Sequence, residues 1–231
     1  MTQGFIFCRL VVIVHLAAVT PELIAWEVMN PGNERQLEII IRVYNYAEAP
    51  QQTITRAKMQ IAKILNHAGV MTRWIDCSVS STATEGDAAC QERMLPSELA
   101  IMIFHKFKLP NGVSRDTHLG SAEVLSNRQP GHYINLSYDH IRDSDYSGVF
   151  CSPETLAEVA AHEIGHVLFR SIDHSPTGLM RARWDRQDFQ NAAIGNLLFT
   201  PRQAEIIQAE VAARIKEAEA EGSKAGSVWP K

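Results

Sequence analysis

The feature that most constrains the fold of this chain is a predicted helix that begins at Ser152. Ser152 is a favourable N-cap, Pro153 suits the first helical position, and Glu154 complements the helix dipole. Residues 156–168 are apolar around much of the helix surface. We therefore expect this helix to be buried, with the rest of the protein packed around it.

This helix carries the motif with the clearest chemistry. Residues 162–166 read His-Glu-Ile-Gly-His, and helical spacing places His162 and His166 one turn apart on one face, as a zinc site needs. Glu163 stands beside them, where it can take a proton from a metal-bound water molecule. The alternative is a core helix with two satisfied histidines, which would bury two imidazoles and a carboxylate without compensation. The pattern therefore predicts a zinc site (Zn2+) with Glu163 as general base.

A third histidine, a turn and a methionine follow the helix. His174 comes after His166 with seven residues between them. Residues 175–178 read Ser-Pro-Thr-Gly, which is typical of a turn, and Met180 follows. Taken alone, Met180 would be a core methionine that fills a gap. The histidine and the turn before it make a role beneath a metal site an equal alternative.

Together these features resemble the metzincin clan of zinc endopeptidases, and among them most closely matrixin-type domains. The resemblance implies His162, His166 and His174 as zinc ligands, Glu163 as general base and Met180 as the residue of the Met-turn. Residues 34–212 are also similar to a family of uncharacterised exported bacterial zincin-like proteins. That similarity is carried by residues 42–47, Trp74 with Asp76 and Cys77, Leu119 with Gly120, the extended His-Glu-Ile-Gly-His segment and residues 198–201.

The sequence departs from the metzincin pattern between the second and third histidines. That pattern has five residues there, with a glycine where the helix ends, whereas this chain has seven and Phe169 at the glycine position. Without the glycine we expect the helix to run another half turn and reverse near residues 171–173. Asp173 is a rival third ligand, since a few metzincins use Asp there, and Glu205 is another, as in gluzincins. We favour His174, because histidine is the commoner zinc ligand and the local turn fits.

The rest of the chain predicts an α+β fold. A helix over residues 53–68 follows the first strand, and an amphipathic helix covers residues 202–221 near the end. The predicted architecture is zincin-like: a mixed twisted sheet with helices in an N-terminal lobe, the active-site helix, and a smaller helical C-terminal lobe. The predicted strands cover residues 34–47, 70–76, 98–107, 121–125 and 132–138.

The N-terminal residues predict export. Residues 10–19 form an apolar run that is too short to span a bilayer and matches the h-region of a secretory signal. Cleavage would fall near Ala25; the alternative is a buried N-terminal strand or helix. We expect residues 1–25 to be a signal peptide, residues 26–221 a zincin-like metallopeptidase domain and residues 222–231 a flexible tail. The mature protein would be secreted or extracytoplasmic, with no stable membrane insertion.

The four cysteines are too few for a disulfide-built scaffold. Cys8 would leave with the signal peptide, so Cys77, Cys90 and Cys151 would remain in an oxidising compartment. Cys77 and Cys90 flank a polar loop and could close it as a disulfide, which leaves Cys151 over. The alternative is three free thiols.

Composition and charge narrow the function further. Twenty-two basic against 26 acidic residues leave no basic excess, which argues against a nucleic-acid partner. We expect a monomeric zinc metalloendopeptidase that acts on a peptide or protein substrate. The resemblance implies that the substrate strand lies along a sheet edge near residues 132–138. The alternative is a non-catalytic zincin-fold module with a structural zinc, which the irregular spacing of the third ligand favours.

Overall fold

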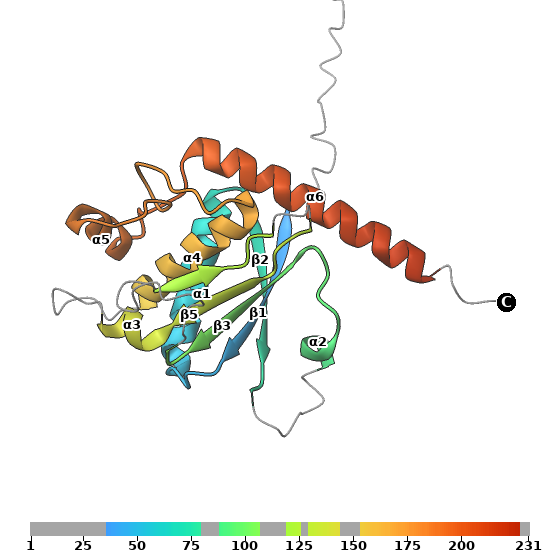
Figure 1. The fold of residues 1–231 in the computed structure, drawn as a ribbon, viewed down its shortest axis with the longest axis horizontal. Coiled ribbons are helices and arrows are strands. Elements are labelled where there is room, and N and C mark those ends of the chain that lie inside the picture. Colours follow the sequence, from blue (N-terminus) through green and yellow to red (C-terminus); the bar gives the residue numbers. More distant parts are fainter. Residues whose placement is uncertain (1–35, 80–87, 107–118, 126–128, 144–152, 227–231) are drawn as a thin grey trace, which may run out of the picture. The chain divides into compact units, whose positions relative to one another are not determined.

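Five strands form one mixed sheet in the order β2-β1-β3-β5-β4 (Figure 1). The computed structural model describes residues 36–79, 88–106, 119–125, 129–143 and 153–226. The strands are β1 (Glu38–Asn45), β2 (Met71–Cys77), β3 (Glu98–Phe104), β4 (Gly120–Ala122) and β5 (Tyr133–Ser137). The helices are α1 (Gln51–His67), α2 (Ala88–Gln91), α3 (Tyr138–Asp143), α4 (Pro153–Phe169), α5 (Arg186–Ala193) and α6 (Pro201–Gly226).

The α+β class and the mixed sheet predicted from the sequence are confirmed. The predicted order of one strand, a helix and further strands holds for β1, α1, β2, β3, β4 and β5. The short helices α2 and α3 were not predicted. A helix of four or six residues has too little periodicity to be recognised in a sequence.

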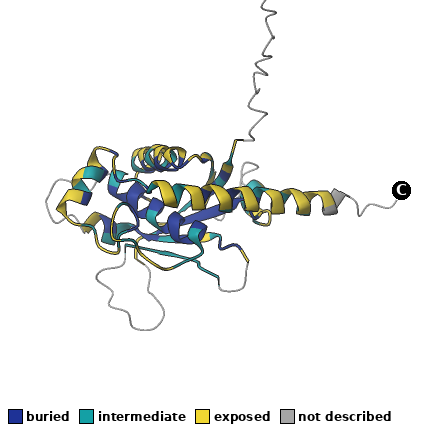
Figure 2. Cartoon of the chain, turned by 90° about the horizontal axis from the view of Figure 1, so that it is seen from above, coloured by how far each residue is buried: buried dark blue, intermediate teal, exposed yellow. Residues whose placement is uncertain are grey.

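The sheet buries one face under α1 and α4. Alternate residues of β1, namely Ile39, Ile41 and Val43, are at most 4% exposed and belong to the core that includes both helices. Helix α4 contacts α1, α5, α6, β4 and β5, and most of its residues are buried, as its apolar sequence predicts. By contrast, α6 has exposed residues along much of its length (Figure 2).

The edge of the sheet next to α4 differs from the prediction. Strand β5, which lies within residues 132–138, pairs in parallel with β3 and antiparallel with β4, so it is an interior strand. The edge strand is β4 (Gly120–Ala122). The prediction of an edge at residues 132–138 is therefore wrong. A short strand at residues 121–125 was expected, but its sequence does not indicate that it pairs on the outer side of β5.

The C-terminal helix is longer than predicted. Helix α6 runs to Gly226, so residues 222–226 are helical rather than part of a flexible tail. Alanine, glutamate and lysine around Gly222 favour the helix, and one glycine costs only about 1 kcal/mol. A Cβ added at Gly222 would have no neighbour within 4 Å, so no packing requires this glycine.

A buried arginine, Arg214, attaches helix α6 to the rest of the fold. The Arg214 side chain is fully buried, and its guanidinium donates to the carbonyls of Gly131 at 2.9 Å and Val167 at 3.3 Å. Its Nε donates to Glu210 at 2.8 Å. The residue thus connects α6 to the chain before β5 and to the end of α4.

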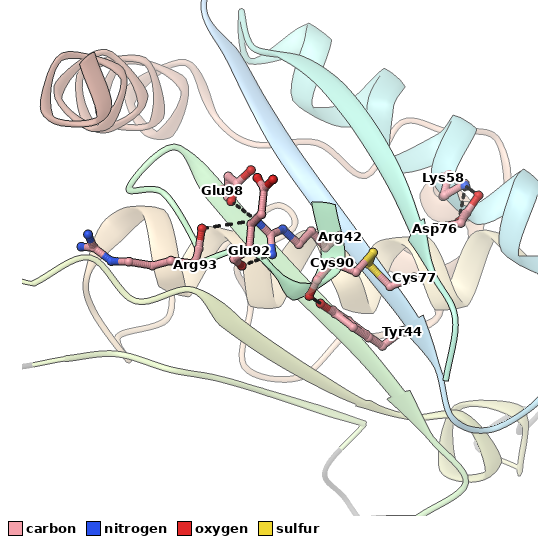
Figure 3. Close-up of a disulfide and its surroundings, with 9 residues drawn as sticks. All are labelled: Arg42, Tyr44, Lys58, Asp76, Cys77, Cys90, Glu92, Arg93 and Glu98. Carbon is pink, nitrogen blue, oxygen red and sulfur yellow. Dashed lines mark hydrogen bonds and ion pairs between the residues drawn. A yellow bond between two sulfur atoms is a disulfide. The ribbon is translucent and has the colours of Figure 1, made fainter. Parts of the chain in front are cut away.

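A disulfide between Cys77 and Cys90 closes the polar loop that these residues flank (Figure 3). It connects the end of β2 to α2 across a Cα–Cα distance of 5.7 Å. Trp74 and Asp76 face Lys58 of α1, so Cys77 points to the opposite face of the sheet. The Tyr44 hydroxyl donates to the Cys90 carbonyl at 3.2 Å on that face.

Several predictions fall outside the described residues. The signal peptide over residues 1–25 with its cleavage near Ala25, the cysteines Cys8 and Cys151, and the N-cap Ser152 all belong to this part of the chain. Among the residues that are described, no helix combines the length and the apolar character that crossing a membrane requires.

Candidate metal centre

Three histidines meet at one end of the buried helix. His162 and His166 lie on α4, and His174 comes from the loop that follows it. Their possible ligand atoms all lie within 4.8 Å of one another, and within the described residues no other cluster of His, Cys, Asp or Glu could hold a metal ion. Of the three candidates for the third ligand, the structure brings His174 to the pair.

The two rivals of His174 have other partners. The Asp173 carboxylate accepts a hydrogen bond from the Ser171 hydroxyl at 2.8 Å, within its own loop. Glu205 is exposed on α6, where it pairs with Arg202 at 2.8 Å. Neither belongs to the three-histidine group.

Backbone carbonyls fix the orientation of the two helical histidines. His162 Nδ1 lies 2.8 Å from the carbonyl oxygen of Leu179, and His166 Nδ1 lies 2.8 Å from that of Ser171. Because a carbonyl can only accept, both Nδ1 atoms must carry the proton. In the neutral rings, each Nε2 then presents a lone pair. Metal-ligating histidines are typically held in this way.

The two Nε2 atoms face each other at 3.1 Å. Two lone pairs at this distance repel unless a cation lies between them. Two nitrogen ligands of a tetrahedral zinc, each about 2.05 Å from the ion, would stand roughly 3.3 Å apart. The donor set and its spacing therefore fit a zinc ion.

The protonation states suit metal binding as well. Burial lowers the pKa of His162 to about 4, with a smaller contribution from the neighbouring histidines. Burial also lowers the pKa of His166. Both imidazoles are therefore neutral at pH 7, which is the form that binds a metal.

Glu163 lies between α4 and the edge strand. Its side chain is 9% exposed, and burial raises its pKa to about 8. A Cβ added at Gly120 of β4 would stand 2.7 Å from Glu163 Cγ, so the β4 backbone runs directly against this carboxylate. The Glu163 side chain therefore lies beside β4, which is an edge strand among the described strands.

Helix α4 ends earlier than the missing glycine suggests. It stops at Phe169, and Arg170 takes the left-handed conformation with φ of 51°. The Ser171 N–H donates to the His166 carbonyl and the Arg170 N–H to that of Val167, both at 3.3 Å, which is a Schellman motif. The predicted extra half turn is therefore wrong, because arginine replaces glycine one residue later.

The side chain of Arg170 stabilises this reversal. Its Nε donates to Glu210 of α6 at 2.8 Å, and the same carboxylate oxygen accepts from Arg214. A left-handed non-glycine residue costs roughly 1–2 kcal/mol, which these contacts offset. The chain then turns back toward α4, which places His174 beside His162 and His166.

Met180 packs beneath the helix between the first two histidines. It is 1% exposed, and a Cβ added at Gly165 would lie 2.5 Å from its Sδ. The turn before it is closed by Ser175 N–H donating to the Met180 carbonyl at 2.8 Å, with Gly178 at φ of 73°. Met180 is thus a core methionine that packs against α4 between His162 and His166.

Sequence reasoning missed Trp184, which lies beside the histidines. Its ring centroid is 5.9 Å from that of His162, and its Nε1 donates to the Leu179 carbonyl at 3.1 Å. No ligand spacing or motif marks this residue in the sequence. The contact depends on a carbonyl, which a sequence pattern does not reveal.

Comparison of the sequence with protein-family models and with curated proteins gives no match. Comparison with solved structures finds an archaemetzincin from Methanopyrus kandleri, with a TM-score of 0.47 and 13% sequence identity. The alignment covers 77% of this chain and 98% of that chain.

Proposed function

We propose that this protein is a zinc-dependent metalloendopeptidase. The observation that carries the proposal is the group His162, His166 and His174, with the carboxylate of Glu163 next to it. The described residues supply three ligands to this group, which leaves one position of a tetrahedral zinc for water or substrate. Catalytic zinc sites have such an open position, whereas structural sites are closed by four protein ligands.

In the proposed peptide hydrolysis, different residues of the chain have different roles. A zinc ion at the three imidazoles would polarise the scissile carbonyl and activate a water molecule. The carbonyls of Leu179 and Ser171 hold two of the imidazoles in the ligand tautomer. In its ionised form, which a nearby cation would favour, Glu163 takes the proton of the attacking water and passes it to the leaving amine.

The edge strand β4 supplies a place for the substrate backbone. Among the described strands, β4 has one neighbour, β5, so its outer side is free to pair with an extended peptide. Because β4 runs against Glu163, a peptide on that side would pass close to the base and the histidines. This support favours a peptide substrate over a small molecule.

Metal content tests the ligand set. We expect one zinc per chain in the wild-type protein, loss of zinc in His174→Ala, and wild-type zinc in Asp173→Ala and Glu205→Gln. A folded wild-type protein without zinc would contradict the proposal. Zinc retained in His174→Ala would move the third ligand elsewhere.

Turnover tests the role of Glu163. The zinc-loaded protein is incubated with a peptide library, and the products are read by mass spectrometry. Glu163→Gln should keep zinc and lose cleavage, because glutamine cannot accept a proton from water. Equal cleavage by Glu163→Gln and wild type would rule out this mechanism, while zinc binding with no cleavage by either would favour a structural zinc module.

We also propose that the protein acts outside the cytoplasm. The apolar run over residues 10–19 and the disulfide between Cys77 and Cys90 support export, since disulfides persist in oxidising compartments. N-terminal sequencing of the protein recovered from an expressing bacterium tests this proposal. A mature N-terminus near residue 26 is expected, and a cytoplasmic protein that keeps residues 1–25 would contradict it.

A further inference from the structure

One backbone carbonyl accepts hydrogen bonds from two aromatic side chains. The oxygen of Leu179 lies 2.8 Å from His162 Nδ1 and 3.1 Å from Trp184 Nε1. A carbonyl oxygen has two lone pairs, so these two donors use its full capacity. The indole and the imidazole also meet edge to face, with centroids 5.9 Å apart and an interplanar angle of 78°.

Trp184 is itself held from the other side. Its ring packs edge to face on Phe189 of α5, with centroids 6.0 Å apart. The next residue, Asp185, is the N-cap of α5 and accepts from the N–H groups of Gln187 and Asp188. The Arg181 side chain bonds to Asp185 and Asp188 as well. The segment that carries Trp184 is therefore anchored to the capped N-terminus of α5.

We propose that Trp184 is a positioning residue of the metal centre. By fixing the Leu179 carbonyl, it fixes the direction in which His162 Nδ1 donates and hence the direction in which His162 Nε2 points. This inference depends on one part of the proposed function, namely that the three histidines bind zinc. It adds a role for α5, which no ligand spacing in the sequence indicates.

The physical consequence concerns the geometry of one ligand. Without the indole N–H, the Leu179 carbonyl would accept one hydrogen bond in place of two. Its peptide group would then have more freedom to rotate. The imidazole then samples more orientations around the metal. Outer-shell partners of metal ligands are typically worth about 10–100-fold in metal affinity. Because Trp184 acts through a shared carbonyl, we expect the low end of this range.

The test compares Trp184→Phe with Trp74→Phe in the full chain. Phenylalanine keeps an aromatic ring at position 184 and removes the N–H donor. Trp74 lies on β2 against Lys58 of α1, with Lys58 Nζ 5.8 Å from its ring, and serves as the matched control. Zinc affinity is measured by competition with a chelator, and ligand geometry by the visible absorption of the cobalt-substituted protein.

We expect Trp184→Phe to weaken zinc binding about tenfold and to shift the cobalt bands. Trp74→Phe should change neither. Equal zinc affinity and identical cobalt spectra in Trp184→Phe and wild type would overturn this inference and leave the proposed function standing. Loss of cleavage in Trp184→Phe at unchanged affinity and spectrum would overturn it too, since it would indicate a substrate contact.

Two further results separate the remaining outcomes. Absence of zinc binding by the wild-type protein would overturn the proposed function and this inference together. If Trp184→Phe does not fold, Phe189→Leu loosens the indole and keeps its N–H donor. That variant should weaken zinc binding less than tenfold and shift the cobalt bands in the same direction; a wild-type affinity and spectrum would overturn the inference.

Discussion

Met180 lies directly against Gly165, the residue of the His-Glu-Ile-Gly-His motif that stands just before the second histidine. A Cβ at Gly165 would come within 2.5 Å of Met180 Sδ and 3.0 Å of Phe199 Cε1. The methionine can therefore reach the helix backbone between His162 and His166 only because position 165 has no side chain.

This contact predicts the effect of Gly165→Ala. The added methyl group must push Met180 and Phe199 away from α4, and overpacking of this kind costs about 1–3 kcal/mol. We expect a lower free energy of unfolding and weaker zinc binding. Gly222→Ala is the matched control, because it sits in open space on α6 and should stabilise the protein by up to about 1 kcal/mol. Urea unfolding checks both, and equal stability of Gly165→Ala and wild type would contradict the packing argument.

Gly120→Ala should separate catalysis from metal binding. A Cβ at this position would lie 2.7 Å from Glu163 Cγ and 2.8 Å from its Oε1, so the carboxylate must move. The three histidines are untouched, and zinc content should equal that of the wild type. Displacing a base by about 1 Å can cost about 10²-fold in rate. Peptide cleavage at equal zinc loading is the measurement, and a wild-type rate would show that Glu163 need not stand where the structure has it.

Glu158 predicts a pH dependence of stability. Its side chain is fully buried on α4, where Oε1 accepts from Gln60 at 3.2 Å, and burial raises its pKa from 4.5 to about 8. A raised folded-state pKa favours the protonated form. The stability from this group is therefore complete below about pH 4.5 and is lost as the pH rises through about 8.

Glu158→Gln should remove this loss, since glutamine stays neutral at every pH. The variant should gain stability over the wild type between pH 5 and pH 9, on the order of a few kcal/mol. Glu154→Gln on the same helix is the control, because Glu154 forms a partly exposed ion pair with Arg56 worth at most about 1 kcal/mol. Thermal unfolding at several pH values checks the pair. A Glu158→Gln gain that is the same at pH 5 and pH 9 would show that Glu158 is charged in the fold.

Removing the disulfide should leave the metal centre intact. Cys77 and Cys90 are joined across 13 positions of sequence on the sheet face opposite α1. Closing a loop of about 15 residues is worth roughly 3 kcal/mol. The double variant Cys77→Ala, Cys90→Ala should therefore unfold at lower denaturant concentration and still bind one zinc. Loss of zinc at a pH and temperature where the variant is folded would show that the two faces of the sheet are coupled.

Much of the fold was predictable because its elements are long and periodic. The buried helix α4 carries Pro153, Glu154 and its apolar pattern in its own residues, and the four-residue spacing of His162 and His166 follows from helix geometry alone. The pairing of β4 outside β5 was not predictable, because three small residues do not indicate which strand they will join. Sheet order is a property of the whole chain.

The same distinction between local sequence and whole-chain structure applies to the candidate site. The three histidines and Glu163, which we propose as ligands and base, are side chains with recognisable spacing, and the sequence indicates them. The groups that orient the ligands are the carbonyls of Leu179 and Ser171, which every residue possesses and no pattern marks. The helix end was misjudged for a related reason: glycine is the usual residue in the left-handed conformation, and Arg170 takes it here with the help of Glu210 on a helix 40 residues later.

The position of Glu210 in the sequence bears on the order in which parts of the protein can fold during synthesis. Glu210 contacts both Arg170 and Arg214, and both contacts depend on α6, which is synthesised after the three histidines. Folding during synthesis proceeds from the N-terminal side. A nascent chain that ends before α6 would already contain all three histidines, but the turn that carries the third would lack its anchor. We therefore expect the loop that carries His174 to reach its final arrangement only after α6 has been synthesised and has packed against it.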